Sequence, residues 1–143
     1  MGWVYLFAGW AKITDPEWTA AGYIRVAKTF PSFFAWFASD ANIGWVNTIN
    51  MWGLFLIGAA LILGVAVKFA SYMGVLITLM YYFPVLDFPK AGPHGYIIED
   101  HVIYALIFVV FAAFAAGRVW GLDGWLERRG FFKKIPWLSA IWG

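Results

Sequence analysis

Three long stretches of this sequence contain no charged residue, and they restrict the fold more than any other feature. They cover residues 41–67, 69–86 and 102–117, which are 27, 18 and 16 positions long. A helix needs roughly 20 apolar residues, at about 1.5 Å each, to cross a hydrocarbon core of about 30 Å. The first two stretches meet this requirement, and the third does so once its flanks are included. The sequence therefore predicts membrane-spanning helices over about 43–67, 69–86 and 97–117.

A shorter apolar stretch, residues 1–11, lies at the start of the sequence. At about 1.5 Å per residue it reaches only half-way across a bilayer. We interpret it as the C-terminal half of a first span over about residues 1–12. The predicted fold class is therefore all-α: an integral membrane four-helix bundle that forms a single domain, residues 1–143, and lies in the cell membrane as a multi-pass protein.

Composition agrees with this class and argues against several others. The chain is 63% hydrophobic and only 13% charged, whereas an average soluble domain is about 25% charged. A soluble enzyme of this size needs more charge to cover its surface. A net charge of +2 is too small to indicate a nucleic-acid partner. The chain has no cysteine, and its two histidines, His94 and His101, lie at one junction rather than on facing helices, so neither a metal nor haem is predicted.

Two segments rich in aromatic residues lie outside the predicted spans. In residues 15–40, Thr14 and Glu17 have the spacing of a capping box, which predicts a helix from about 15 to 29 that ends before Pro31. The tail, residues 123–142, combines basic pairs with tryptophans, as expected of an anchor on an anionic leaflet. We predict that both segments are helical and lie in the membrane interface.

Lysine and arginine are distributed unequally between the two ends of the predicted bundle. Cytoplasmic loops carry an excess of basic residues, so we predict that the more basic end, together with both termini, faces the cytoplasm. The more basic end holds Lys68, Arg118, Arg128, Arg129, Lys133 and Lys134, and the outer end holds Lys12, Arg25, Lys28 and Lys90.

Ionisable residues at the ends of spans are candidates for function, because charge is costly there. Lys12 closes the first helix and is either a lysine that extends to the interface or an anion-binding, proton-coupled lysine. Asp100 and His101 open the last span, with Tyr104 one turn further in. Acidic residues favour any helix N-terminus, but a carboxylate beside a histidine can also relay protons at neutral pH. The sequence leaves both alternatives open at each place.

Two further polar groups have a structural interpretation. Residues 117–123 (GRVWGLD) predict a basic end of the last span, followed by a glycine turn and an aspartate cap. A polar rim at the outer end of the second span is typical of residues that tie helices together. The rim consists of Asn42, Asn47, Thr48 and Asn50.

These stretches together resemble the DoxX/DoxD family of small four-helix membrane proteins. The resemblance rests on FAGWAKITDPEW near the start, WGLFLIGAALILGVAVKFASYMG across the second and third spans, and IEDHVIYALIFVVFAAFAAGRVWGLD near the end. Their order and spacing fit from residue 5 to about residue 126. The motif residues are Gly9, Trp10, Gly53, Gly58, Gly117, Arg118, Gly121 and Asp123.

The resemblance implies a role in respiratory membranes. DoxD proteins are the small membrane subunit of thiosulfate:quinone oxidoreductase, which oxidises thiosulfate to tetrathionate and, together with a second subunit, passes the electrons to a membrane quinone. It therefore implies a quinone as cofactor, and membrane lipid and other redox subunits as partners. Thiosulfate is a dianion and needs basic residues, so the predicted substrate-binding residues are Lys12, Trp18, Arg25 and Lys28. The predicted catalytic residues, which would supply protons to the quinone, are Asp100, His101 and Tyr104.

The chain departs from the family pattern in two places. Relatives carry a further half-helix before the Gly9 stretch, so we expect either a start codon upstream or a partner subunit that covers the short helix. Relatives also often carry a carboxylate where Trp52 precedes Gly53. The alternative hypothesis is therefore a non-catalytic structural or assembly subunit of a larger respiratory or oxidase complex. A solute channel is disfavoured, because no predicted span carries a charge in its interior.

Overall fold

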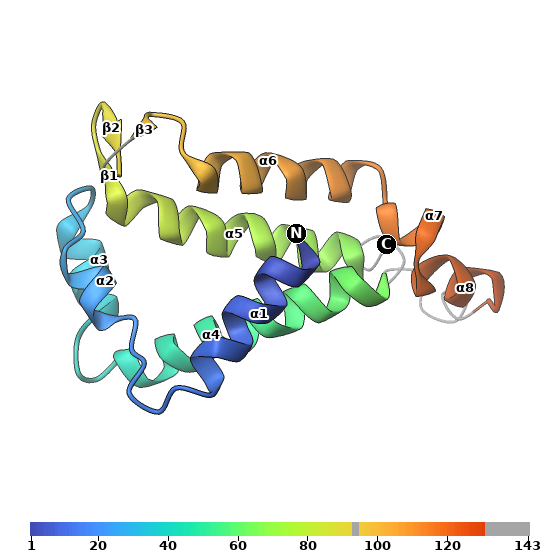
Figure 1. The fold of residues 1–143 in the computed structure, drawn as a ribbon, viewed down its shortest axis with the longest axis horizontal. Helices are drawn as coiled ribbons and strands as arrows, with labels where there is room; N and C mark the ends of the chain where they lie inside the picture. The colour runs from blue at the N-terminus through green and yellow to red at the C-terminus, as the bar shows by residue number, and fades with distance from the viewer. Residues whose placement is uncertain (93–94, 131–143) are drawn as a thin grey trace.

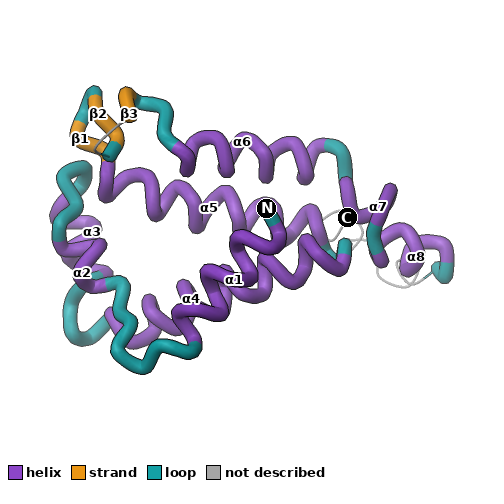
Figure 2. The backbone as a smooth tube through the Cα atoms, viewed as in Figure 1, coloured by secondary structure: helices purple, strands orange, loops and turns teal. Residues whose placement is uncertain are grey.

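The computed structural model describes residues 1–92 and 95–130 and is mostly helical, which confirms the predicted all-α class at this level (Figures 1 and 2). The helices are α1 (Gly2–Ile13), α2 (Ala21–Arg25), α3 (Pro31–Phe37), α4 (Ile43–Leu63), α5 (Val67–Val85), α6 (Asp100–Ala113), α7 (Ala116–Trp120) and α8 (Leu122–Arg128). Three two-residue strands, β1 (Leu86–Asp87), β2 (Lys90–Ala91) and β3 (Gly95–Tyr96), pair antiparallel in the order β1-β2-β3.

The four longest helices pack as two pairs. Helix α1 lies along α4, α5 lies along α6, and α4 and α5 join the two pairs. The pairs are close together near α7 and diverge toward α2 and α3, which lie across the open end (Figure 1). The core sits where the pairs meet, and its central buried residues come from three helices. They are Tyr5, Leu54, Ile57 and Phe108.

Glycines permit the closest helix contacts. Gly9 of α1 lies against the backbone of Phe55, and Gly58 of α4 lies against the backbone of Leu6, so the two helices cross with no side chain between them at these points. Such small-residue contacts are common where helices pack in membranes. Gly53, one and a half turns before Gly58, has no comparable neighbour, since a Cβ there would meet only the end of a flexible isoleucine at 3.5 Å.

Asp123 closes the opposite end of the bundle. Its side chain is fully buried, and its carboxylate accepts hydrogen bonds from the backbone N–H groups of Ala66 (2.8 Å) and Val67 (3.0 Å) at the start of α5. The backbone N–H of Asp123 donates to the carbonyl oxygen of Gly64 at 2.9 Å. The predicted aspartate cap therefore exists, but the helix that it caps is α5 rather than its own. Gly121 makes room for this contact, because a Cβ there would lie 2.5 Å from the Cα of Gly64.

The segment before α4 is less helical than predicted. The prediction of a capping box is wrong. Thr14 ends α1, and its hydroxyl donates to the carbonyl oxygen of Trp10 at 3.0 Å. The Asp15 carboxylate accepts a hydrogen bond from the Glu17 N–H at 3.1 Å in a local turn. Short side chains such as Asp15 compete with helix formation in this way. Residues 15–40 therefore hold two short helices, α2 and α3, rather than one helix that begins near residue 15.

The last predicted span is shorter than the expected 97–117. Helix α6 begins at Asp100, because Ile97 has a φ of +55° and Glu99 is the N-cap. It ends at Ala113, because Ala115 has a φ of +47° and starts α7 in a new direction. At about 1.5 Å per residue, 14 residues extend about 21 Å. The predicted tail, 123–142, is described only up to residue 130, where it contains α8; its remainder and His94 lie outside the described residues.

One helix of the described chain, α4, is long and apolar enough to cross a membrane, and α6 is apolar but shorter. Many large apolar side chains on the bundle surface are exposed. They include Ile49, Trp52, Leu56 and Ile62 on α4, Phe69, Tyr72, Met73 and Leu76 on α5, and Ile103, Leu106, Val109 and Val110 on α6.

Candidate functional site: a cavity at the open end of the bundle

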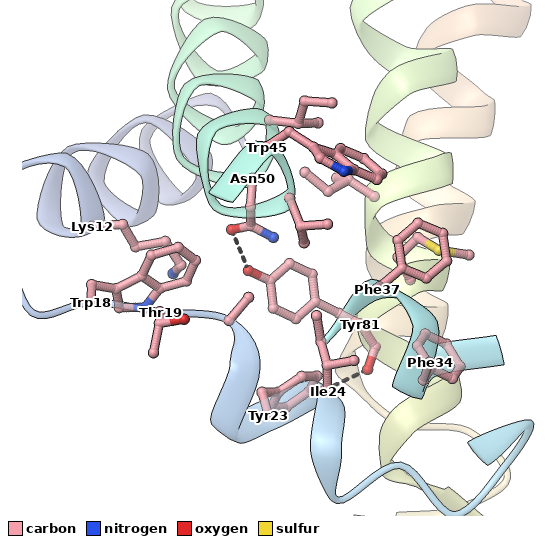
Figure 3. Close-up of a pocket in the computed structure, with 15 residues that line it drawn as sticks. Lys12, Trp18, Thr19, Tyr23, Ile24, Phe34, Phe37, Trp45, Asn50 and Tyr81 are labelled. Atoms are coloured by element: carbon pink, nitrogen blue, oxygen red, sulfur yellow. Dashed lines mark hydrogen bonds between the residues drawn. The ribbon is translucent and has the colours of Figure 1, made fainter. Parts of the chain in front are cut away.

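A cavity of about 340 Å³ lies where α4 and α5 diverge, with α2 and α3 across its mouth (Figure 3). Its wall is mostly aromatic and aliphatic, with a few polar groups. The residues that line it are Lys12, Trp18, Thr19, Ala20, Tyr23, Ile24, Phe34, Phe37, Trp45, Val46, Ile49, Asn50, Ile77, Met80 and Tyr81. An apolar cavity of this size with a few convergent polar groups is the usual form of a small-molecule site.

Lys12 is the cation of this cavity. It belongs to the last turn of α1, and its Nζ lies 5.2 Å from the centroid of the Trp18 ring, which is the geometry of a cation–π contact. Within the described residues no carboxylate forms an ion pair with Lys12. A half-buried ammonium that lacks such a partner is suited to a ligand that supplies an oxygen acceptor.

Tyr81 and Asn50 form the second polar group of the cavity. The Tyr81 hydroxyl donates to Oδ1 of Asn50 at 2.7 Å, which joins α5 to α4 across the cavity. From the mouth, the Tyr23 hydroxyl donates to the main-chain oxygen of Tyr81 at 2.5 Å. Burial, with the nearby Glu99 charge as a smaller cause, raises the pKa of Tyr23 well above its usual value, so this phenol remains a proton donor.

Asn47 holds another part of the cavity wall in place. Its side-chain oxygen accepts a hydrogen bond from the backbone N–H of Ala20 at 2.9 Å, and its amide group donates to the Thr19 hydroxyl at 3.2 Å. These bonds hold the segment after α1 against α4. The prediction that the polar rim ties segments together is thus confirmed for Asn47 and Asn50.

His101 lies behind the Tyr81 ring. The two rings are stacked, with centroids 5.8 Å apart and planes 11° from parallel, and the centroid of the Tyr104 ring lies 6.4 Å from the imidazole centroid. Oε2 of Glu99 accepts from the backbone N–H of His101 at 3.2 Å and lies 2.5 Å from its Nδ1. Glu99 therefore both caps α6 and orients the imidazole, whereas Asp100 is exposed.

The structure brings together only part of the predicted anion site. Lys12 and Trp18 meet at the cavity wall, but Arg25 and Lys28 are exposed and do not line it. Arg25 lies 3.9 Å from Asp40, and Lys28 lies 2.5 Å from Asp87. These two cations already have carboxylate partners outside the cavity.

Several residues of the site were not predicted. Tyr81 was not predicted, and Asn50 was predicted only as a residue that ties helices together; the signal that could have placed both in a site is their polar character at apolar depth. Glu99 belongs to the acidic start predicted for the last span but was not among the predicted catalytic residues; its position just before the helix start is a typical N-cap signal. In the described part of the chain, no group of three or more His, Cys, Asp or Glu residues could hold a metal ion.

The remaining motif residues lie away from the cavity. Trp10 is exposed, with its ring 6.3 Å from that of Phe55. Gly117 makes room for the Asp123 carboxylate, since a Cβ there would lie 2.3 Å from Oδ2. Arg118 pairs with Glu127 of α8 at 3.4 Å.

The chain matches no known protein-family model, no curated protein and no solved structure with which it was compared. Membership of the DoxX/DoxD family therefore stays a prediction from the sequence motifs.

Proposed function

We propose that this chain is a DoxD-like, multi-pass membrane subunit of a respiratory redox complex, and that its cavity binds the headgroup of a membrane quinone. In this proposal a partner subunit takes electrons from thiosulfate, and the quinone in the cavity receives them. The observation that carries the proposal is the aromatic cavity with Lys12 on one side and the Tyr81–Asn50 pair on the other.

The surface of the described bundle supports a multi-pass arrangement. Large exposed apolar side chains follow α4, α5 and α6 along their lengths, and a soluble protein rarely exposes continuous apolar surface of this extent. The cell membrane is the environment that such a surface fits. We place α1, α4, α5 and α6 as its spans, with α7 and α8 on the cytoplasmic side because of their basic residues.

The chemistry of the cavity fits a quinone. A flat, apolar ring fits between aromatic side chains such as Trp18, Phe37 and Tyr81. The carbonyl oxygens of a quinone are acceptors, and the ammonium of Lys12 is a donor beside the cavity. Reduction of a quinone also consumes protons. His101, which stacks on Tyr81, together with Glu99 at its Nδ1, forms a carboxylate–imidazole pair next to the cavity wall that is suited to proton transfer.

The described residues of the cavity do not include a cluster of cations that could bind thiosulfate, because Arg25 and Lys28 form ion pairs with carboxylates outside the cavity. We therefore assign thiosulfate oxidation to the partner subunit. The same observation favours the second candidate function, a non-catalytic structural or assembly subunit. Trp52, which stands in place of the family's carboxylate, is half exposed on α4 and also favours this alternative.

Activity of the purified complex separates the two functions. We expect thiosulfate-dependent reduction of a soluble quinone analogue, and we expect His101→Ala to reduce its rate about 100-fold, the lower end of the range for a proton-transfer contribution. The matched control is Asp100→Ala, one residue away but exposed, which should change the rate less than twofold. Equal rates in wild type and His101→Ala would favour the structural subunit.

Quinone binding should depend on Lys12. Replacing it by methionine keeps the length of the side chain but removes the donor, and a hydrogen bond from a charged donor contributes about 1.5–3 kcal/mol. We expect the affinity for a short-chain quinone, measured by calorimetric titration of the purified chain, to fall about tenfold. Lys90→Met, in strand β2 away from the cavity, is the control. Similar affinities for both variants would argue against a quinone in this cavity.

The orientation of the bundle can be tested with single cysteines, since the chain has none of its own. Lys90 and Arg128 are exposed, and the elements that carry them, β2 and α8, lie at opposite ends of the described bundle (Figure 1). A membrane-impermeant thiol reagent added outside intact cells should label Lys90→Cys and should label Arg128→Cys only after the membrane is opened. Labelling of both variants in intact cells would contradict a multi-pass arrangement with this orientation.

A further inference from the structure

The end of the bundle formed by α7 and α8 combines exposed apolar side chains with basic ones. Trp120 is 95% exposed and Phe114 is 75% exposed, and Val119, Leu122 and Trp125 are exposed beside them. The basic residues at this end of the described chain are Lys68, Arg118, Arg128 and Arg129. Arg129 lies over the Trp125 ring, 4.8 Å from its centroid.

Carboxylates at this end do not cancel the basic charge. Asp123 is buried and bound to the start of α5, so it does not face outward. Glu127 lies 3.4 Å from Arg118. The opposite end differs, because Arg25 and Lys28 each pair with a carboxylate there. The outward-facing charge of the α7–α8 end is therefore positive.

An apolar notch of about 220 Å³ opens at the same end, between the α4–α5 turn, α6 and α7. Its wall includes Gly117 and the side chains of Leu61, Ile62, Val67, Phe111 and Trp120. A wall without a charged side chain suits a hydrocarbon chain, and the residue next to Gly117 in the sequence is the basic Arg118.

We infer that the α7–α8 end binds an anionic phospholipid of the surrounding leaflet, with an acyl chain in the notch and its phosphate among the basic residues. The inference rests on the membrane location in the proposed function. The positive charge of this end favours an anionic headgroup. The exposed Trp120 and Phe114 favour a lipid over a free phosphate, because contact with apolar surface adds no binding free energy for a free anion. A soluble polyanion would likewise leave the notch and these two side chains uncovered.

The test is lipid binding to the full chain purified in mild detergent. Thermal unfolding is followed by tryptophan fluorescence while phosphatidylglycerol or phosphatidylcholine is added, and the apparent affinity is taken from the dependence on lipid concentration. We expect phosphatidylglycerol to bind at least tenfold more tightly than phosphatidylcholine. Arg128→Gln combined with Arg129→Gln should remove most of this preference, since each basic residue near an anionic leaflet contributes about 1 kcal/mol. Glycerol phosphate should have no effect.

Two further variants show whether charge is responsible. Arg128→Lys combined with Arg129→Lys keeps the charge and should keep the preference. Arg25→Gln combined with Lys90→Gln removes two charges from the other end and should also keep it. Equal affinity for both lipids in the wild type, or equal loss in all the double variants, would overturn the inference. If the chain did not enter lipid vesicles of either composition, the membrane location itself would fail, and that outcome is distinct from a missing headgroup preference.

Discussion

Replacing Asp123 by alanine is expected to lower the free energy of unfolding by about 4 kcal/mol, one of the largest effects of any single side chain in this protein. Each hydrogen bond to a charged group contributes about 1.5–3 kcal/mol. Asp123 accepts two of them, from the N–H groups of Ala66 and Val67. Alanine leaves both donors without their acceptor, the Val67 N–H in a buried position and the Ala66 N–H in a partly buried one.

The reason for the large effect is the place of these bonds in the fold. The first N–H groups of a helix have no partner within the helix, and α5 obtains its partner from a residue 56 positions later in the sequence. The residue at the start of α5 is Ala66, whose φ of +51° is unfavourable for a residue with a Cβ. The Asp123 carboxylate helps to hold the α4–α5 turn in this conformation.

Two variants make the test specific. Asp123→Asn keeps the size of the side chain but offers one acceptor oxygen and a donor that faces an N–H group, so we expect about half of the loss. Glu127→Gln changes an exposed carboxylate on the same helix and should alter stability by less than about 0.5 kcal/mol. The measurement is equilibrium unfolding in mixed micelles, followed by circular dichroism. A loss for Asp123→Ala no greater than that for Glu127→Gln would show that the contact does not stabilise the fold.

The extent to which the sequence predicts this fold depends on how local each signal is. Both bounds of α1 and the start of α4 follow from the apolar stretches: residues 1–12 were predicted and Gly2–Ile13 is observed, and 43–67 was predicted against Ile43–Leu63. The early end of α4 follows from Gly64, which adopts a φ of +66°. The break after α6 could not be predicted, because Ala113 and Ala115 are good helix formers and nothing local favours the φ of +47° that Ala115 adopts.

The candidate site was harder to predict, because its contacts join residues far apart in the sequence. The number of cations at the outer end predicted an anion-binding cluster. This cluster does not form around the cavity, because Lys28 pairs with Asp87 and Arg25 pairs with Asp40. His101 was correctly placed next to a carboxylate, but which of Glu99 and Asp100 turns toward it depends on the start of α6. Lys12 and Trp18 come together because α1 ends at Ile13 and the chain turns back.

Replacing Gly58 by alanine is expected to destabilise the bundle by about 2 kcal/mol, whereas Gly53→Ala on the same helix should stabilise it by up to about 1 kcal/mol. Both substitutions favour a helix intrinsically, since alanine is better than glycine by about 1 kcal/mol. They differ in the space that is available for the added Cβ atom. A Cβ at position 58 would lie 2.1 Å from the backbone nitrogen of Leu6, and overpacking of this kind costs about 1–3 kcal/mol or more. A Cβ at position 53 makes only an ordinary contact.

A variant at Gly9 tests whether the effect of Gly58→Ala on stability comes from the α1–α4 contact. A Cβ on Gly9 would lie 2.3 Å from the backbone nitrogen of Phe55, so Gly9→Ala forces the same two helices apart from the other side. Once α1 has moved away from α4, a second Cβ at the crossing meets little resistance. We therefore expect the double variant to be less destabilised than the sum of the two single variants, by about 1 kcal/mol, in equilibrium unfolding in mixed micelles. Strict additivity, or a Gly53→Ala variant as unstable as Gly58→Ala, would show that the close backbone contact does not control how α1 packs.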